Sequence, residues 1–224
     1  MALILCLETA THLCSVALSR DGAAIASRDL MSTGYTHAEK LNVFVDEVLK
    51  EAGVAMHELE AVAVGIGPGS FTGLRIGLSA AKGFCYPLGI PIIGIGTLDT
   101  LCEAAQEKAD LQGMRLWPMV DARRMEVFTR SAGGEEVAAV VLSNEWVAAL
   151  DKSQKHAVFG EGADKAAALF AQSDGALHVH GVVPLASAMA PLAEARYRAK
   201  AFDDLAYLTP LYGKEAGVTL TKKG

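Results

Sequence analysis

The most informative segment of the chain is Gly65-Ile66-Gly67-Pro68-Gly69-Ser70-Phe71-Thr72-Gly73-Leu74-Arg75-Ile76-Gly77. It follows the apolar run 61–65, which predicts a buried strand. The closely spaced glycines and Pro68 predict a tight turn, and Ser70 or Thr72 is suited to cap the helix that follows. We expect that helix over residues 72–86. A strand, a glycine turn and a helix in this order indicate an α/β fold.

The same turn is a candidate phosphate site, because free N–H groups gather at the positive end of a helix. Its candidate contacts are Gly67, Gly69, Ser70 and Thr72. The segment nevertheless lacks the Lys-Ser or Lys-Thr pair of a Walker loop, and Ser70 stands where the dinucleotide fingerprint needs its last glycine. The pattern alone therefore favours a structural turn over a phosphate site.

Three glycines, Gly73, Gly77 and Gly83, fall inside the predicted helix. Glycine in a helix interior costs about 1 kcal/mol relative to alanine, so a compensating contact is expected. Close approach of another helix would supply it. That helix could belong to the protein's own core or to another subunit, and the spacing does not distinguish the two.

The strands and helices predicted on either side of this segment follow an order that occurs twice along the chain. Upstream lie three strand-like runs and an amphipathic helix, 36–52, and downstream lie a further strand and helix. Asp21-Gly22 predicts a tight hairpin turn between the second and third strands. A second strand meander followed by alternating helices and strands occupies the rest of the chain. We therefore predict two related lobes, residues 1–108 and a smaller one of residues 109–224.

Composition narrows the classes of function. Of the 224 residues, 51% are hydrophobic and 21% are charged, which is typical of a folded protein with a substantial core. The formal charge of −6 disfavours unaided RNA binding. The four cysteines form no C-x-x-C pair and lie in apolar stretches, as expected of reduced thiols in the cytoplasm. Glu8 interrupts the apolar N-terminus, so we expect neither a signal peptide nor a membrane span.

The histidines and acidic residues predict no metal centre. None of the six histidines has H-x-x-x-H or H-E-x-x-H spacing. His178 and His180 could share one face of a strand, but the sequence names no third ligand. Glu8 and Asp121 each end a predicted strand, where sugar kinases hold magnesium, and each could equally cap a turn.

Several segments together resemble the TsaB (YeaZ) family. They are the glycine segment 67–77, the opening 4–11, the segment around His37, the stretch 120–128 and Pro210-Leu211-Tyr212. The resemblance implies the two-lobed fold shared by actin, hexokinase and the heat-shock chaperone ATPases, the ASKHA superfamily. That fold agrees with the two lobes predicted above. Glu8 departs from the family pattern, which usually has Asp, and Gly213-Lys214 replaces an expected Leu-Arg.

The resemblance also implies a role. TsaB proteins pair with the related TsaD and, with the ATPase TsaE, attach threonylcarbamoyl to adenosine 37 of tRNA. TsaD carries a metal-binding H-x-x-x-H motif. Here Leu41 stands four residues after His37, so the resemblance implies a non-catalytic subunit that meets tRNA only through the complex. The second lobe is short for an ATPase domain. We therefore expect no cofactor bound by this chain alone, with ATP or ADP at the interface of the complex.

The two helices 36–52 and 72–86 are predicted to form the face that docks onto TsaD, and to pair two copies of the chain as a homodimer when TsaD is absent. The expected interface residues are His37, Leu41, Val45, Val48, Gly73, Leu74, Gly77, Leu78 and Ala81. Part of this apolar stripe is expected to be buried only in the complex. The competing hypothesis is an ATPase or small-molecule kinase that uses residues 67–70 for phosphate and Glu8 or Asp121 for magnesium.

Overall fold

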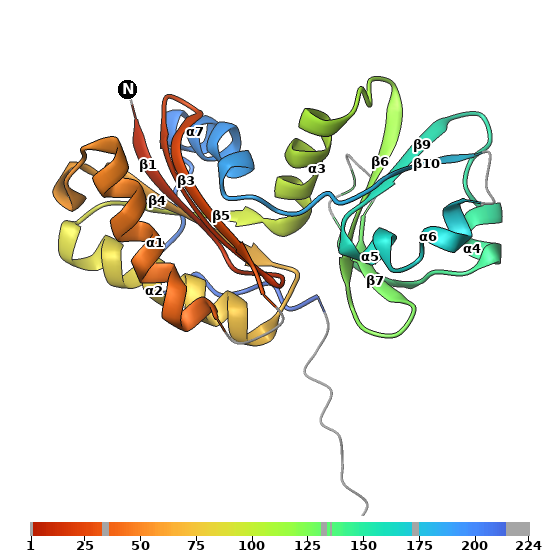
Figure 1. Ribbon diagram of the computed structural model, residues 1–224, viewed down its shortest axis with the longest axis horizontal. Helices are drawn as coiled ribbons and strands as arrows, with labels where there is room; N and C mark the ends of the chain where they lie inside the picture. Colours follow the sequence, from red (N-terminus) through yellow and green to blue (C-terminus); the bar gives the residue numbers. More distant parts are fainter. Residues whose placement is uncertain (1, 33–35, 131–133, 135, 172–174, 214–224) are drawn as a thin grey trace, which may run out of the picture.

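Two five-stranded sheets lie side by side in the computed structural model, each with helices on both faces (Figure 1). The structure describes residues 2–32, 36–130, 134, 136–171 and 175–213. None of the helices within these ranges is long and apolar enough to cross a membrane.

The first sheet has the order β3-β2-β1-β4-β5. Its strands are β1 (Leu3–Glu8), β2 (Leu13–Arg20), β3 (Ala23–Met31), β4 (Ala61–Gly67) and β5 (Ile92–Gly96). Strands β1, β2 and β3 are antiparallel, whereas β4 and β5 run parallel to β1. The predicted hairpin turn is confirmed, since Asp21 and Gly22 have φ values of 54° and 81°.

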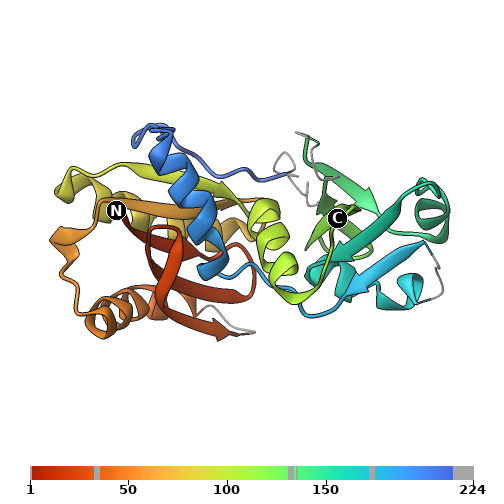
Figure 2. The ribbon, with the colours of Figure 1, turned by 90° about the horizontal axis from the view of Figure 1, so that it is seen from above.

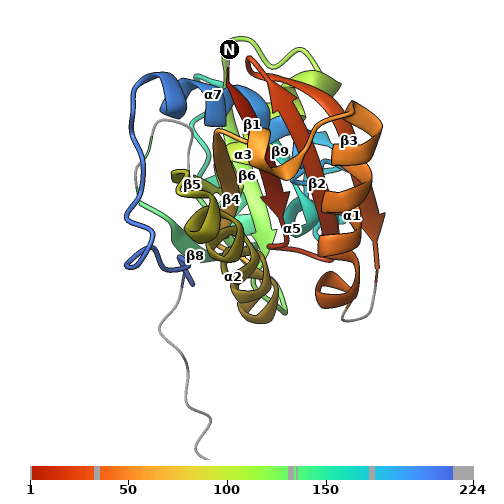
Figure 3. The ribbon, with the colours of Figure 1, turned by 90° about the vertical axis from the view of Figure 1, so that its left-hand side faces the viewer.

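Alternate residues of β1 supply the two faces of this sheet. Leu3, Leu5 and Leu7 pack against α1 (His37–Ala52) and α2 (Phe71–Leu88), which lie side by side on one face (Figure 3). A short 3₁₀ turn, η1 (Met56–Glu58), follows α1. Both helices end at a glycine in the left-handed region, Gly53 and Gly89. The predicted end of the second helix at residue 86 is two residues short.

The opposite face of the first sheet is covered by the C-terminal part of the chain. Here η2 (Ser187–Met189) and α7 (Ala190–Arg198) pack on Ile4 and Cys6. The amide of Ala186 donates to Ser15 Oγ at 2.7 Å, and that of Asp203 donates to the Ile92 carbonyl at 3.0 Å.

The predicted second lobe, residues 109–224, therefore needs correction. Residues from about Ala186 to Tyr212 return to the first lobe (Figure 1), Gly213 lies against Phe128 of the second lobe, and residues 214–224 lie outside the described part. The physical reason is that β1 is apolar on both faces, so a second layer must cover it.

The second sheet repeats the plan of the first, with the order β10-β9-β6-β7-β8. Its strands are β6 (Met114–Asp121), β7 (Glu126–Thr129), β8 (Ala138–Val141), β9 (Lys155–Phe159) and β10 (Ala176–Val179). Helix α3 (Thr97–Lys108) covers one face. Three short helices cover the other (Figure 2), namely α4 (Asn144–Ala148), α5 (Glu161–Asp164) and α6 (Ala167–Phe170). Since each sheet is a meander joined to two parallel strands, the predicted fold class is confirmed.

Candidate functional site

An open groove runs between α1 and α2 on the outer face of the first lobe. It encloses about 600 Å³ and its lining is mainly apolar. Its lining residues are Ala38, Leu41, Asn42, Phe71, Thr72, Arg75, Ile76, Ser79 and Ala80. A second hollow of about 300 Å³ shares Asn42 and continues along α1 toward Met56 and Phe84. Together they form one long apolar surface, which we call the α1–α2 groove.

Of the residues predicted to lie at the partner interface, Leu41 lines this groove and Val45 lines its continuation. Nine side chains or glycines were expected there, and all nine are buried in the chain by itself: His37, Leu41, Val45, Val48, Gly73, Leu74, Gly77, Leu78 and Ala81. The expectation that part of this stripe is buried only in a complex is wrong. Helical spacing identifies an apolar stripe on a helix. Here the whole stripe is buried within the lobe as part of its core. The exposed positions beside it form the accessible surface.

The loop between β1 and β2, residues 9–12, explains two of the helical glycines. Thr9 donates its hydroxyl to the carbonyl of Gly73 at 2.8 Å. A methyl group added at Gly73 would collide with the Thr9 carbonyl oxygen, and one added at Gly77 would collide with Thr9 Oγ1. The close neighbour of α2 is therefore a loop of the same lobe and not another helix. Gly83 has no atom within 4 Å of its added methyl group, so this explanation does not extend to it.

The glycine turn is shaped to admit backbone from elsewhere in the chain. The amide of Ser70 donates to the Ala10 carbonyl at 2.6 Å, and an added methyl group at Gly69 would collide with the same oxygen. A methyl group added at Gly67 would collide with the Leu211 carbonyl oxygen. Ser70 caps α2 by accepting from the Gly73 amide at 3.2 Å, as predicted. Carbonyl oxygens thus occupy the inner side of the turn and would repel a phosphate there, while Ser70 and Thr72 remain exposed on the outer side.

A C-terminal segment closes the other side of the turn. The amide of Leu211 donates to the Ile66 carbonyl at 2.7 Å. Tyr212 packs its ring on Phe71 with centroids 4.8 Å apart and accepts from Arg75 Nε at 3.0 Å. The Arg75 guanidinium also lies 3.8 Å from the centre of the Phe71 ring. The segments that carry the family resemblance near residues 8, 70 and 211 therefore meet at one end of α2.

Glu8 is buried beside this loop, with none of its surface exposed. Its Oε1 accepts from the Ala10 amide at 2.6 Å, whereas Oε2 has no hydrogen-bond partner and lies over Gly65. Burial raises the pKa of the Glu8 carboxyl to about 7, outweighing the hydrogen bonds that lower it. A carboxyl group that is sealed from solvent leaves no room for the water ligands that magnesium usually keeps.

Asp121, the second candidate magnesium ligand, ends β6 in the other lobe. Its Oδ1 accepts from the Arg123 amide at 2.7 Å and forms an ion pair with Lys165. The lysine already supplies the positive charge that a metal ion would bring. Each of the two carboxylates thus accepts a hydrogen bond from the backbone amide two residues later, as the turn-capping alternative anticipated.

His37 begins α1 and reaches back to the same loop. Its Nε2 lies 2.9 Å from the Thr11 carbonyl oxygen, and burial lowers the pKa of its imidazole. Leu41, one turn later, is only 1% exposed and packs in the core. His37 is therefore a buried contact between α1 and the loop, with no second histidine on the next turn to share a metal ion.

Comparison with known proteins gives a consistent picture. The TsaD family model, described as tRNA N6-adenosine threonylcarbamoyltransferase, matches residues 32–210. The chain is 35% identical over 163 residues to the tRNA threonylcarbamoyladenosine biosynthesis protein TsaB of Escherichia coli, covering 64% of this chain and 69% of that protein. It is 32% identical over 126 residues to TsaB of Bacillus subtilis, covering 56% of this chain and 53% of that protein.

Solved structures extend the similarity to nearly the whole chain. YeaZ from Pseudomonas aeruginosa superposes with a TM-score of 0.77 and 27% identity, covering 95% of this chain and all of that one. The ethanolamine utilization protein EutJ from Carboxydothermus hydrogenoformans reaches a TM-score of 0.54 at 10% identity, over 85% of this chain and 90% of that one. The second likeness supports the fold alone.

Proposed function

Because this chain belongs to the TsaD family and, within it, to the TsaB proteins of tRNA threonylcarbamoyladenosine biosynthesis, we propose that it is a non-catalytic subunit. It supports a TsaD-like partner in transferring threonylcarbamoyl to adenosine 37 of tRNA. The observation that carries the proposal is the core position of Leu41, where H-x-x-x-H spacing would require a metal-binding histidine. A tRNA substrate implies a cytoplasmic location.

The α1–α2 groove is the proposed docking surface for the TsaD-like partner. The core residues Leu41 and Val45 line it. It also carries exposed positions such as Ala38, Ser79 and Phe71, the last 48% exposed. A partner helix laid in the groove would cover apolar surface on both α1 and α2. In the absence of that partner, the same groove would pair two copies of the chain around a two-fold axis.

The complex supplies what this chain lacks. We infer that this subunit binds no nucleotide cofactor alone, that ATP or ADP lies where it meets its partner, and that a TsaE-like ATPase completes the assembly. Two features of this chain disfavour phosphate binding by the chain alone, namely the carbonyl oxygens on the inner side of the glycine turn and the negative net charge. The subunit would act by stabilising the competent conformation of its partner, and it would contact tRNA only within the complex.

Reconstitution tests the proposal. Nucleoside mass spectrometry of tRNA should detect the threonylcarbamoyl product when this chain is added to a TsaD-like and a TsaE-like protein with the threonylcarbamoyl donor. The product should be strongly reduced when this chain is omitted. Equal product in both reactions would contradict the proposal.

Calorimetry with ATP and magnesium on the isolated chain tests the kinase alternative. No micromolar binding and no hydrolysis are expected. Hydrolysis that Asp121→Asn abolishes would favour the enzyme hypothesis, and it would also show that the Lys165 ion pair does not keep Asp121 from binding magnesium.

A further inference from the structure

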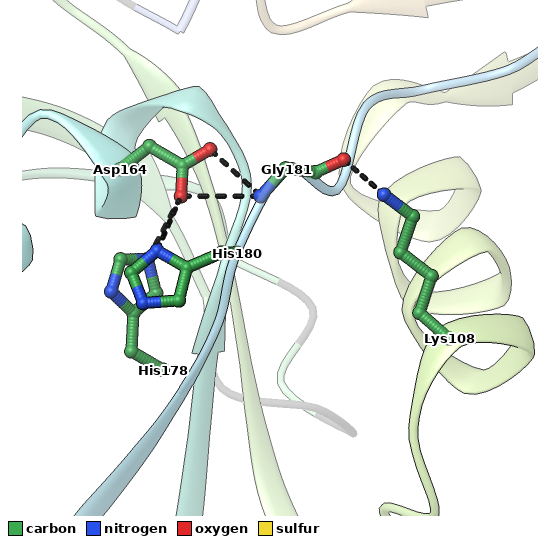
Figure 4. Close-up of polar contacts among 5 residues, drawn as sticks. All are labelled: Lys108, Asp164, His178, His180 and Gly181. Carbon is green, nitrogen blue, oxygen red and sulfur yellow. Dashed lines mark hydrogen bonds and ion pairs between the residues drawn. The ribbon is translucent and has the colours of Figure 1, made fainter.

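Three side chains with metal-binding groups converge in the second lobe, near the C-terminal end of α3. Asp164 is the last residue of α5, His178 lies in β10, and His180 follows that strand. One ligand atom from each of the three lies within 4.8 Å of the others. Figure 4 shows the two imidazole rings beside the carboxylate.

The local backbone explains the convergence. His178 lies on β10 and His180 in the turn directly after it, and their side chains lie on the same side. Their ring centroids are 3.8 Å apart. The His178 ring is held against Phe170 at a centroid distance of 5.6 Å, and its side chain is only 7% exposed. One imidazole is therefore fixed in place, while His180, 72% exposed, faces solvent.

Both rings turn a nitrogen toward one oxygen atom. His178 Nε2 lies 2.9 Å from Asp164 Oδ1, and His180 Nδ1 lies 3.7 Å from the same atom. A neutral imidazole carries a lone pair on one nitrogen, so the pair can offer lone pairs to a cation.

Backbone contacts hold the carboxylate in position. The Gly181 amide donates to Asp164 Oδ2 at 3.2 Å and to Oδ1 at 3.4 Å. The Gly181 carbonyl in turn accepts from Lys108 Nζ at the end of α3 (Figure 4). Supporting hydrogen bonds of this kind orient the ligands of metal sites.

We propose that Asp164, His178 and His180 bind a divalent transition-metal ion, Zn²⁺ being the ion best matched to two imidazoles and one carboxylate. Two neutral imidazoles with a carboxylate are a common donor set for Zn²⁺, and three protein ligands leave one tetrahedral position for water or an external ligand. The exposed His180 side gives the ion access from solvent. A bound ion would join β10 to α5 and, through Gly181 and Lys108, to α3 between the two lobes.

Zinc titration of the tag-free full chain tests the site, by calorimetry and by competition with a chromophoric chelator. One equivalent should bind with micromolar or tighter affinity and raise the melting temperature. His180→Ala and Asp164→Asn should each weaken binding at least tenfold. The first removes an exposed ring, and the second keeps the shape of the residue and an acceptor for Gly181. His57→Ala, which removes an exposed histidine elsewhere, is the matched control and should bind as the wild type does.

Two results would overturn the proposal. One is wild-type binding no tighter than millimolar, which would leave Asp164 and the histidines as a hydrogen-bonded group only. The other is tight binding that persists unchanged in both His180→Ala and Asp164→Asn, which would place the ion elsewhere. Circular dichroism of each variant without metal verifies that loss of binding is not loss of fold.

Discussion

Thr9 donates its hydroxyl to the carbonyl oxygen of Gly73 at 2.8 Å, joining two residues that are 64 positions apart in the chain. Through this contact the loop after β1 lies directly on the first turn of α2. In the same loop, the Ala10 carbonyl accepts from the Ser70 amide, and the Thr11 carbonyl oxygen lies within hydrogen-bond distance of the His37 ring. The starts of both groove helices are thus positioned by one short loop.

Replacing Gly73 tests that contact. Gly73→Ala should lower the free energy of unfolding by roughly 1–3 kcal/mol, because its methyl group meets the backbone carbonyl of Thr9, which cannot move alone. Gly83→Ala is the matched control in the same helix. No atom lies near its added methyl group, so it should gain up to about 1 kcal/mol from helix propensity. Urea unfolding measures both, and equal stability of the two variants would contradict the packing described here.

Glu8 should make stability depend on pH. Burial raises the pKa of its carboxyl from the ordinary 4.5 to about 7. Between these values the folded chain keeps a proton that the unfolded chain releases, so this group lowers the free energy of unfolding as the pH rises from about 4.5 to about 7. Below and above that pH window, the contribution of Glu8 to the free energy of unfolding does not change with pH.

Glu8→Gln removes this dependence while retaining an acceptor for the Ala10 amide. The gain in stability of the variant over the wild type should grow with pH across the window, by on the order of 3 kcal/mol. Glu39→Gln, at an exposed position on α1, serves as control. Urea unfolding at a series of pH values measures the difference, and parallel profiles for wild type and Glu8→Gln would refute the assignment.

A charge placed in the groove should weaken association with the TsaD-like partner. Ala38 is exposed, lines the groove and lies in the first turn of α1, where a glutamate favours the helix dipole. Ala38→Glu should raise the dissociation constant at least roughly tenfold, which is about 1.4 kcal/mol, without loss of stability. Ala195→Glu, at an exposed position of α7 on the opposite face of the same sheet, should leave binding unchanged. Equal affinities for the two variants in calorimetry would show that the partner docks on another surface.

Tyr212 should hold the C-terminal segment against the glycine turn. Its ring contact with Phe71 and its hydrogen bond from Arg75 are lost in Tyr212→Ala. An aromatic pair contributes about 0.5–1.5 kcal/mol, so the Leu211 amide, bonded to Ile66, should exchange with solvent up to roughly tenfold faster. Tyr207→Ala removes an 82% exposed tyrosine from the same segment and is the control. Hydrogen exchange that is unaltered in both variants would show that Tyr212 does not anchor the segment.

Local pattern alone determined the elements of this protein. The glycine turn after a buried strand, the hairpin at Asp21-Gly22 and the helix ending at Gly53 were all predictable, because each depends on residues adjacent in sequence. Two lobes of one plan were predictable for the same reason, and the glycine segment was specific enough to indicate the family. These features follow from backbone preference and hydrophobic period.

Only the tertiary structure decided which neighbour each residue meets. Helical spacing marked Leu41 and Gly77 as special, but it could not show that the sheet and Thr9 already occupy their surroundings. Nor could it show that the chain after Ala186 returns to the first sheet, or that Asp164 lies beside His178 and His180. Contacts between distant residues depend on how whole layers pack, and a periodic pattern carries no information about what lies across the interface.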